Sequence, residues 1–180
     1  MGAVTQTGAT AGSTGVVGGA GVASPTAPRV ASATPVVLQF SPSSLDIRTE
    51  IAIDTGRRRV FDAMLHIAAW WPHRVRAGTA IVLEPRVGGR FFENCDDGCG
   101  ILLGHLARLI TPDEFAIEGT LGLGGPVSAL WSVSLHADGH TRTVLNGRLQ
   151  AFGAIDDAVQ KAAPEQWSAV YNALAHYLAA

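Results

Sequence analysis

The chain has 180 residues, enough for one domain with a single hydrophobic core and an appendage. It carries 13 Lys and Arg against 15 Asp and Glu, so its charge balance gives no electrostatic reason to bind nucleic acid. No apolar run approaches the roughly 18 residues of a membrane-spanning helix. We therefore expect neither nucleic acid nor a membrane as a partner, and we expect a cytoplasmic location.

The first forty residues differ in composition from the rest of the chain. They are mostly Gly, Ala, Thr, Ser, Val and Pro, and Arg29 is the only charged residue before Asp46. Such a segment buries too little apolar surface to offset the entropy lost on ordering. Residues 1–40 are thus predicted to be a disordered tail, with the folded domain over 46–180. A secretory signal around residues 16–23 is the alternative, although no Lys or Arg precedes it.

The folded part is predicted to begin with a strand and two short helices. Apolar and charged residues alternate from Ile47 to Asp54, as they do in a half-buried strand. The period then changes to that of a helix, and Pro72 closes this stretch after two tryptophans. Two brief helices are expected over 57–71.

Strands and turns dominate the next seventy residues. Short runs that favour strands are separated by Gly, Pro and Asp-Gly turn signals. Six strands are expected, at about 79–84, 90–95, 99–110, 114–120, 127–136 and 141–150. Consecutive strands favour an antiparallel sheet, and segregated helices favour the α+β class.

The last stretch predicts a long amphipathic helix. Its apolar residues from Trp167 to Leu178 recur at steps of three and four. Pro164 suits a position in the first turn of a helix, and Asp156-Asp157 suits its negative start. This aromatic stripe must be covered, and the sheet is the surface available to cover it. We expect a curved sheet wrapped around this helix, with a ligand cavity between them.

Several short motifs carry a family resemblance over residues 47–180. In chain order they are Val60-Phe61-Asp62-Ala63-Met64, Trp70-Trp71, Gly88-Gly89-Arg90-Phe91, Asp97-Gly98, the strand from Gly104 to Pro112, Gly139-His140-Thr141, and Trp167 with Leu174 and Tyr177-Leu178. In their order and spacing they resemble the SRPBCC or START-like superfamily. The most similar branch is named for the C-terminal domain of the activator of heat-shock-protein-90 ATPase.

The resemblance implies a helix-grip fold with a hydrophobic pocket between sheet and helix. It implies no single activity, because a fold does not determine a function. Two positions depart from the family pattern. Gln166 replaces a Gly before the helix Trp, and Gly119 stands where a Trp often closes the fifth strand. Both departures change the shape of the expected pocket.

Nine residues are candidates to line a ligand pocket, since such sites are mostly apolar with a few polar anchors. They are Trp70, Trp71, Phe91, Glu93, Trp131, Leu145, Phe152, Trp167 and Tyr171. For each aromatic residue, simple core packing is the alternative.

Glu93 is the polar candidate, because strand alternation places it on the same face as Phe91. If that face is buried, Glu93 is a weak candidate for a catalytic acid or base, or an anchor for a ligand. If a bulge or the strand edge turns it outward, it is simply solvated. Asn146 and Arg148 are further possible anchors, with a solvated strand edge as the alternative.

Cys95 and Cys99 flank a predicted turn at Asp96-Asp97-Gly98. Two reduced thiols are expected in a cytoplasmic protein, and a disulfide across the hairpin is the alternative. Two cysteines and scattered histidines do not make a zinc site, so no metal and no cofactor are predicted.

The leading functional hypothesis is binding of a small hydrophobic molecule without catalysis. The expected partner is a lipid, an aromatic compound or a polyketide-like compound, and a homodimer is a further partner to test. The first alternative is an enzyme of the cyclase, aromatase or hydrolase kind that uses Glu93 for proton transfer. The second is a co-chaperone or stress-response protein, which the family resemblance alone suggests.

Overall fold

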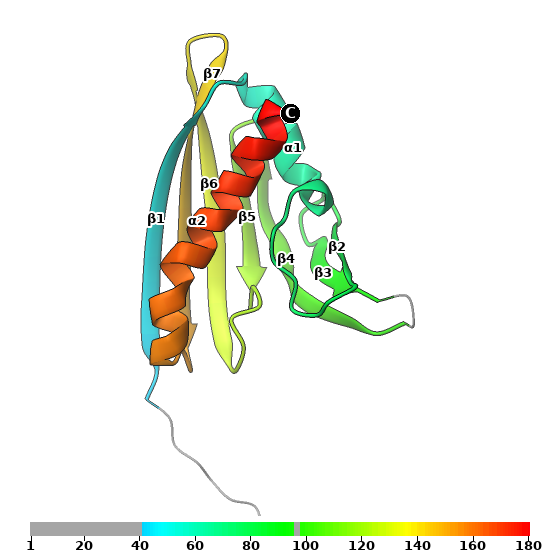
Figure 1. Cartoon of the computed structure of the whole chain (residues 1–180), viewed down its shortest axis with the longest axis vertical. Helices are drawn as coiled ribbons and strands as arrows, with labels where there is room; N and C mark the ends of the chain where they lie inside the picture. Colours follow the sequence, from blue (N-terminus) through cyan, green and yellow to red (C-terminus); the bar gives the residue numbers. More distant parts are fainter. Residues whose placement is uncertain (1–40, 96–97) are drawn as a thin grey trace, which may run out of the picture. The chain divides into compact units, whose positions relative to one another are not determined.

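The computed structural model describes residues 41–95 and 98–180. The predicted tail at 1–40 and the turn residues Asp96 and Asp97 lie outside the described part of the chain. The described residues form one antiparallel sheet of seven strands, two α-helices and a short 3-10 helix (Figure 1).

The sheet has the order β1-β7-β6-β5-β4-β3-β2, so the first and last strands of the chain are neighbours. Every pairing is antiparallel. The strands are β1 (Ser43–Ile53), β2 (Ala80–Leu83), β3 (Arg90–Asn94), β4 (Gly100–Ile110), β5 (Glu114–Gly119), β6 (Val127–Asp138) and β7 (Arg142–Gly153). All seven predicted strands are present, with β1, β6 and β7 each longer than expected.

Two short helices follow β1, as predicted. Helix α1 spans Arg57–Leu65, and the 3-10 helix η1 spans Ile67–Ala69. Val60, Phe61 and Ile67 are buried, so these helices pack their apolar side against the core.

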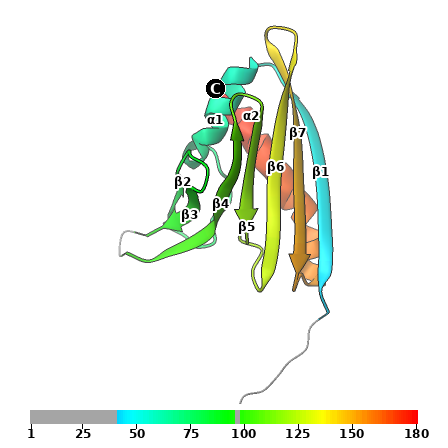
Figure 2. The same ribbon diagram turned by 180° about the vertical axis from the view of Figure 1, so that it is seen from behind.

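Helix α2 (Asp157–Ala179) lies across one face of the sheet (Figure 1), and Figure 2 shows that no helix of the described residues covers the other face. The Asp156 side chain caps the helix by accepting a hydrogen bond of 2.7 Å from the Val159 amide. The helix therefore starts at the acidic pair, as expected. The prediction that Pro164 lies in the first turn is wrong, because this capped start places Pro164 inside the helix.

The core lies between α2 and the inner face of the sheet. Along β6 the odd-numbered residues from Val127 to Leu135 are buried, and β7 repeats this pattern from Thr143 to Gly153. The α+β helix-grip fold predicted from the sequence is confirmed. None of the helices in the described part of the chain is both long and apolar enough to cross a membrane.

Two glycines allow backbones and rings to approach closely. A Cβ on Gly119 would collide with the backbone of Leu103 and Gly104 on the neighbouring strand β4. A Cβ on Gly147 would overlap the hydroxyl group of Tyr171. Gly119, which departs from the family pattern, is therefore needed where β5 meets β4.

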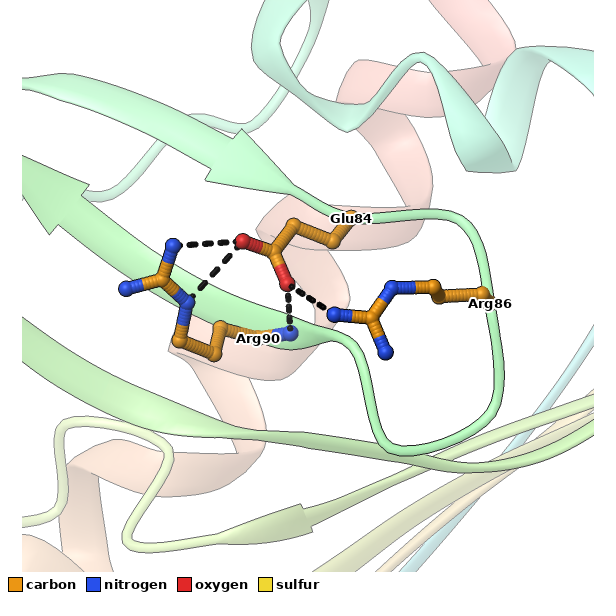
Figure 3. A network of polar contacts seen from close by, with 3 residues as sticks. All are labelled: Glu84, Arg86 and Arg90. Atoms are coloured by element: carbon orange, nitrogen blue, oxygen red, sulfur yellow. Dashed lines mark hydrogen bonds and ion pairs between the residues drawn. The ribbon is translucent and has the colours of Figure 1, made fainter.

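A network of ion pairs closes the turn between β2 and β3 (Figure 3). Glu84 accepts hydrogen bonds from the backbone and guanidinium of Arg90, and Arg86 donates a further bond from the turn itself. The hydrogen bonds from Arg90 hold the pKa of the Glu84 carboxyl below its usual range. This network fixes the turn at the β2 edge of the sheet.

Candidate functional site

A pocket of about 230 Å³ opens between α2, the sheet and two loops. We call residues 71–79, which connect η1 to β2, the pocket loop. The pocket loop contributes Trp71, His73, Arg74 and Val75; the loop from β5 to β6 contributes Leu121, Gly122 and Leu123; α2 contributes Ala163, Gln166 and Trp167; the sheet contributes Glu93, Leu103 and Leu149. The wall is therefore mainly apolar, with a few polar groups.

The N-terminal part of the pocket loop is hydrogen-bonded to α2 and to carbonyl oxygens of its own backbone. The ring of His73 donates from Nε2 to the Gln166 carbonyl oxygen at 2.8 Å, across the mouth of the pocket. Arg74 donates from Nη1 to the carbonyl oxygens of Trp71 and His73, both at 2.7 Å. These bonds hold the loop over the space between helix and sheet.

The C-terminal part of the pocket loop is hydrogen-bonded to Glu93 on β3. This side chain is only 1% exposed and lines the pocket. Its carboxylate accepts from the amide of Val75 at 2.5 Å, the amide of Arg76 at 3.1 Å and the hydroxyl of Thr79 at 2.8 Å. The prediction that Glu93 shares the buried face with Phe91 is right, and the solvated alternative is wrong. Through these three hydrogen bonds the carboxylate holds the pocket loop against the sheet, and in this sense Glu93 acts as a latch.

No cation pairs with Glu93 among the described residues, since its three partners are two backbone amides and a hydroxyl. Glu84, by contrast, is bound by two arginines on the outside of the same hairpin. A buried carboxylate without such bonds would lose several kcal/mol of hydration, so the three donors account for its burial.

Trp71 lies at the centre of an aromatic cluster beside the pocket. Its ring is 5.3 Å from that of Phe91, 5.4 Å from Trp131 and 6.0 Å from Trp167. Most of these pairs are edge-to-face, the arrangement that aromatic quadrupoles favour. The cluster makes one wall of the pocket rigid.

Tyr171 belongs to the packed core and not to the pocket wall. Its hydroxyl accepts from Trp131 Nε1 at 3.0 Å and sits directly on Gly147. Burial raises the pKa of Tyr171 to about 12, while the nearby indole N–H groups of Trp131 and Trp167 act in the opposite direction. Trp167 Nε1 lies near this hydroxyl without the geometry of a full hydrogen bond.

Three of the nine candidate residues line the pocket: Trp71, Glu93 and Trp167. Five are buried core residues that lie outside the pocket wall: Trp70, Phe91, Trp131, Leu145 and Tyr171. Phe152 lies outside this pocket, and it is 60% exposed. Strand β7 continues to Gly153, so alternation turns Phe152 to the outer face.

Sequence reasoning missed most of the pocket's loop residues. His73, Arg74 and Leu121–Leu123 come from irregular segments, where no periodicity shows which side chain points inward. Gln166 was noticed only as a departure from the family pattern. It does lie in the wall, one residue before Trp167.

Asn146 and Arg148 lie on the outer face of the sheet, away from α2, as their solvated alternative proposed. Arg148 donates two hydrogen bonds to Asp46, at 2.8 and 2.7 Å. These bonds are the main reason that the pKa of Asp46 falls to about 2. The two residues therefore contribute to the surface of β1 and β7 and not to the pocket.

Cys95 and Cys99 are joined by a disulfide, so the expectation of two reduced thiols is wrong. The end of the β3–β4 hairpin brings their Cα atoms to 5.2 Å, within the range that a disulfide requires. Arg76 Nη1 lies 3.2 Å from Cys99 Sγ, which places the disulfide beside the pocket loop. Within the described residues, no group of three or more His, Cys, Asp or Glu side chains is arranged to hold a metal ion.

Comparison with solved structures shows the same fold in other proteins. An uncharacterised protein from Rhizobium leguminosarum matches with a TM-score of 0.55 at 19% identity, covering 77% of this chain and 96% of the other. A protein from Mesorhizobium loti matches with a TM-score of 0.55 at 15% identity, covering 74% and 96%. Norcoclaurine synthase from Thalictrum flavum, in complex with dopamine and hydroxybenzaldehyde, matches with a TM-score of 0.52 at 11% identity, covering 81% and 96%.

At these identities the likeness concerns the fold alone. No protein-family model matches the chain, and its sequence has no match among curated proteins. The class defined by fold and site is therefore a helix-grip protein with a small pocket between helix, sheet and pocket loop.

Proposed function

We propose that this protein binds a small hydrophobic molecule in the pocket beneath the pocket loop. The observation that carries the proposal is the pocket itself, which combines two indole rings, several leucines and a few polar groups at one opening. Mostly apolar concave sites with few polar groups are typical of ligand binding. Norcoclaurine synthase, a protein of the same fold, was solved with single-ring compounds, which supports the proposal by analogy.

A proton-transfer enzyme is the weaker candidate. Glu93 is the carboxylate that such an enzyme would use, yet its two oxygens already accept three hydrogen bonds from the pocket loop. Those bonds explain its burial without a reaction. A co-chaperone role is supported only by the family resemblance. The same is true of membership in the branch named for the activator of heat-shock-protein-90 ATPase.

Enlarging one wall residue tests the proposal. Ala163 is buried on α2 and lines the pocket, so Ala163→Met should fill part of the space with little cost to helix formation. Ala158→Met, at an exposed position on the same helix, is the matched control.

The readout is thermal stabilisation by a panel of small apolar compounds, together with native mass spectrometry of protein purified from its own host. The parent protein and Ala158→Met should bind a compound, and Ala163→Met should bind it at least tenfold more weakly. Equal binding by all three proteins would place the ligand elsewhere. Absence of any bound species and of any thermal shift would refute ligand binding.

A further inference from the structure

The pocket differs in size from the cavities that hold lipids or polyketides. Ligand sites for drug-sized molecules occupy about 300–1,000 Å³, and an apolar cavity of about 150 Å³ holds benzene. At about 230 Å³, this pocket fits one ring with a short substituent, or a short branched chain. A long acyl chain or a compound of several fused rings does not fit in it.

The depth of the pocket is almost entirely apolar, and its polar side chains other than Glu93 lie towards the mouth. Except for Glu93, all buried residues of the pocket wall are apolar. Trp71, Leu103 and Trp167 are among them. The exposed lining residues, which mark the mouth, are the polar Arg74 and Gln166 together with Val75 and Gly122. A ligand that matches this arrangement has an apolar body and one polar group that stays at the mouth.

Arg74 is the charged group at this mouth, and it has no carboxylate partner in the described part of the chain. Eight other arginines there pair with Asp or Glu, whereas Arg74 bonds only to two carbonyl oxygens through Nη1. These two bonds orient the guanidinium and leave Nη2 and Nε as donors. A guanidinium with parallel donors free is suited to a carboxylate.

Glu93 decides the orientation of such a ligand. A carboxylate placed deep in the pocket would meet the negative charge of Glu93, whereas one at the mouth meets Arg74. An ammonium group in the depth would need several acceptors, and the Glu93 oxygens are already bonded to three donors. The desolvation of that ammonium among leucines and indoles would oppose its binding.

We infer that the ligand is a small carboxylic acid, with one ring or a short branched chain, whose carboxylate is bound by Arg74 at the pocket mouth. The inference rests on the proposed function and deepens it by naming a ligand class. The apolar body would lie against Trp71 and Trp167, and the carboxylate would remain partly hydrated. Arg74 is thus a residue that determines specificity.

Three compounds with the same ring test this inference on the full chain: phenylacetate, phenylacetamide and 2-phenylethylamine. Binding can be followed by tryptophan fluorescence, because Trp71 and Trp167 line the pocket, and by calorimetry at pH 8. Phenylacetate should bind about fivefold to tenfold more tightly than the neutral amide, and the amine should bind most weakly. Arg74→Gln should abolish the preference for phenylacetate over the amide.

Arg76→Gln is the matched control, because Arg76 lies two residues away on the same loop and outside the pocket wall. It removes the same charge and should keep the preference. Equal binding of phenylacetate and phenylacetamide, or tighter binding of the amine, would overturn the carboxylate inference while leaving ligand binding intact. Loss of the preference in both variants would overturn the role of Arg74. No binding of any of the three compounds would refute the inference together with the proposed function.

Discussion

The apolar face of the sheet is covered in different ways at β6 and β7, which we call the packed end, and at β3 and β4, which we call the pocket end. Beside β6 and β7, large side chains fill the space: Trp131 and Tyr171 are at most 1% exposed, and Tyr171 rests on Gly147 without room for a methyl group. Beside β3 and β4, a backbone loop makes the cover, and polar bonds to Glu93 and Gln166 hold it.

This difference explains where the pocket lies. Aromatic side chains interdigitate to the density of a protein core and leave no space for a ligand. A loop held by a few hydrogen bonds spans a gap without filling it. The packed end should therefore govern the stability of the whole fold, and the pocket end should respond locally.

The largest expected effect is at the packed end. Gly147→Ala places a methyl group on the hydroxyl of a buried tyrosine, so the ring and α2 must shift. We expect a loss of about 3 kcal/mol in the free energy of unfolding, at the upper end for overpacked cores. Urea denaturation followed by circular dichroism measures it. Gly56→Ala is the control, since its Cβ would meet only one atom, at 3.5 Å, and a φ of −64° suits alanine. Similar losses in the two variants would contradict the tight packing at Tyr171.

An effect of intermediate size is expected at high pH. The pKa of Tyr171 is about 12 in the fold, against about 10 for an unfolded tyrosine. The contribution of Tyr171 to the free energy of unfolding is therefore fully present below pH 10. It is lost as the pH rises towards 12, by at most about 3 kcal/mol. Denaturation at a series of pH values should show this decline.

Tyr171→Phe should remove that decline, at a cost of about 1–2 kcal/mol at neutral pH because Trp131 Nε1 loses its acceptor. Tyr177→Phe, at an exposed position on the same helix, should keep the decline. An alkaline decline that persists in Tyr171→Phe would show that another group causes it.

The smallest effect on global stability is expected at the pocket end. Glu93→Gln replaces one acceptor oxygen by an NH₂ group that faces a donor, so at least one bond to the pocket loop is lost. Because the loop can open and let water reach its amides, the free energy of unfolding should fall by only about 1–2 kcal/mol. Hydrogen exchange at Val75 and Arg76 should accelerate much more than exchange in β6 and β7.

Glu118→Gln, at an exposed position on β5, should change neither measurement. Unchanged exchange in the pocket loop of Glu93→Gln would contradict the role of Glu93 as a latch. Uniformly faster exchange throughout the sheet would instead show that the two ends are coupled, and the comparison drawn above would fail.

The regular elements were predictable because their periods are local properties of the sequence. Alternation along β6 and β7 assigned Trp131 and Leu145 to the inner face, and the helical period of α2 assigned Trp167 and Tyr171 to the covered stripe. Alternation was not applied to Phe152, because the last strand was predicted to end at residue 150 whereas β7 continues to Gly153.

The site was predictable only in part, because periodicity gives the face of a side chain and not its depth or neighbours. Trp71, Trp131 and Trp167 look equivalent in the sequence, yet two of them border the pocket and Trp131 is enclosed between rings. Strand alternation placed Glu93 on the same face as Phe91 but left its burial open, because its three donors come from a loop whose path no local pattern specifies.

The sequence by itself determined the element order, the α+β class and the apolar stripe that joins helix to sheet, since each depends on residues close together in the chain. The tertiary structure decided that the cavity lies under the pocket loop and that Tyr171 closes the other end. It also decided that Arg74, at the mouth, has no carboxylate partner within residues 41–95 and 98–180. Those outcomes depend on contacts between segments far apart in the chain. The residues that surround such a side chain in the sequence do not show which distant segment it will contact.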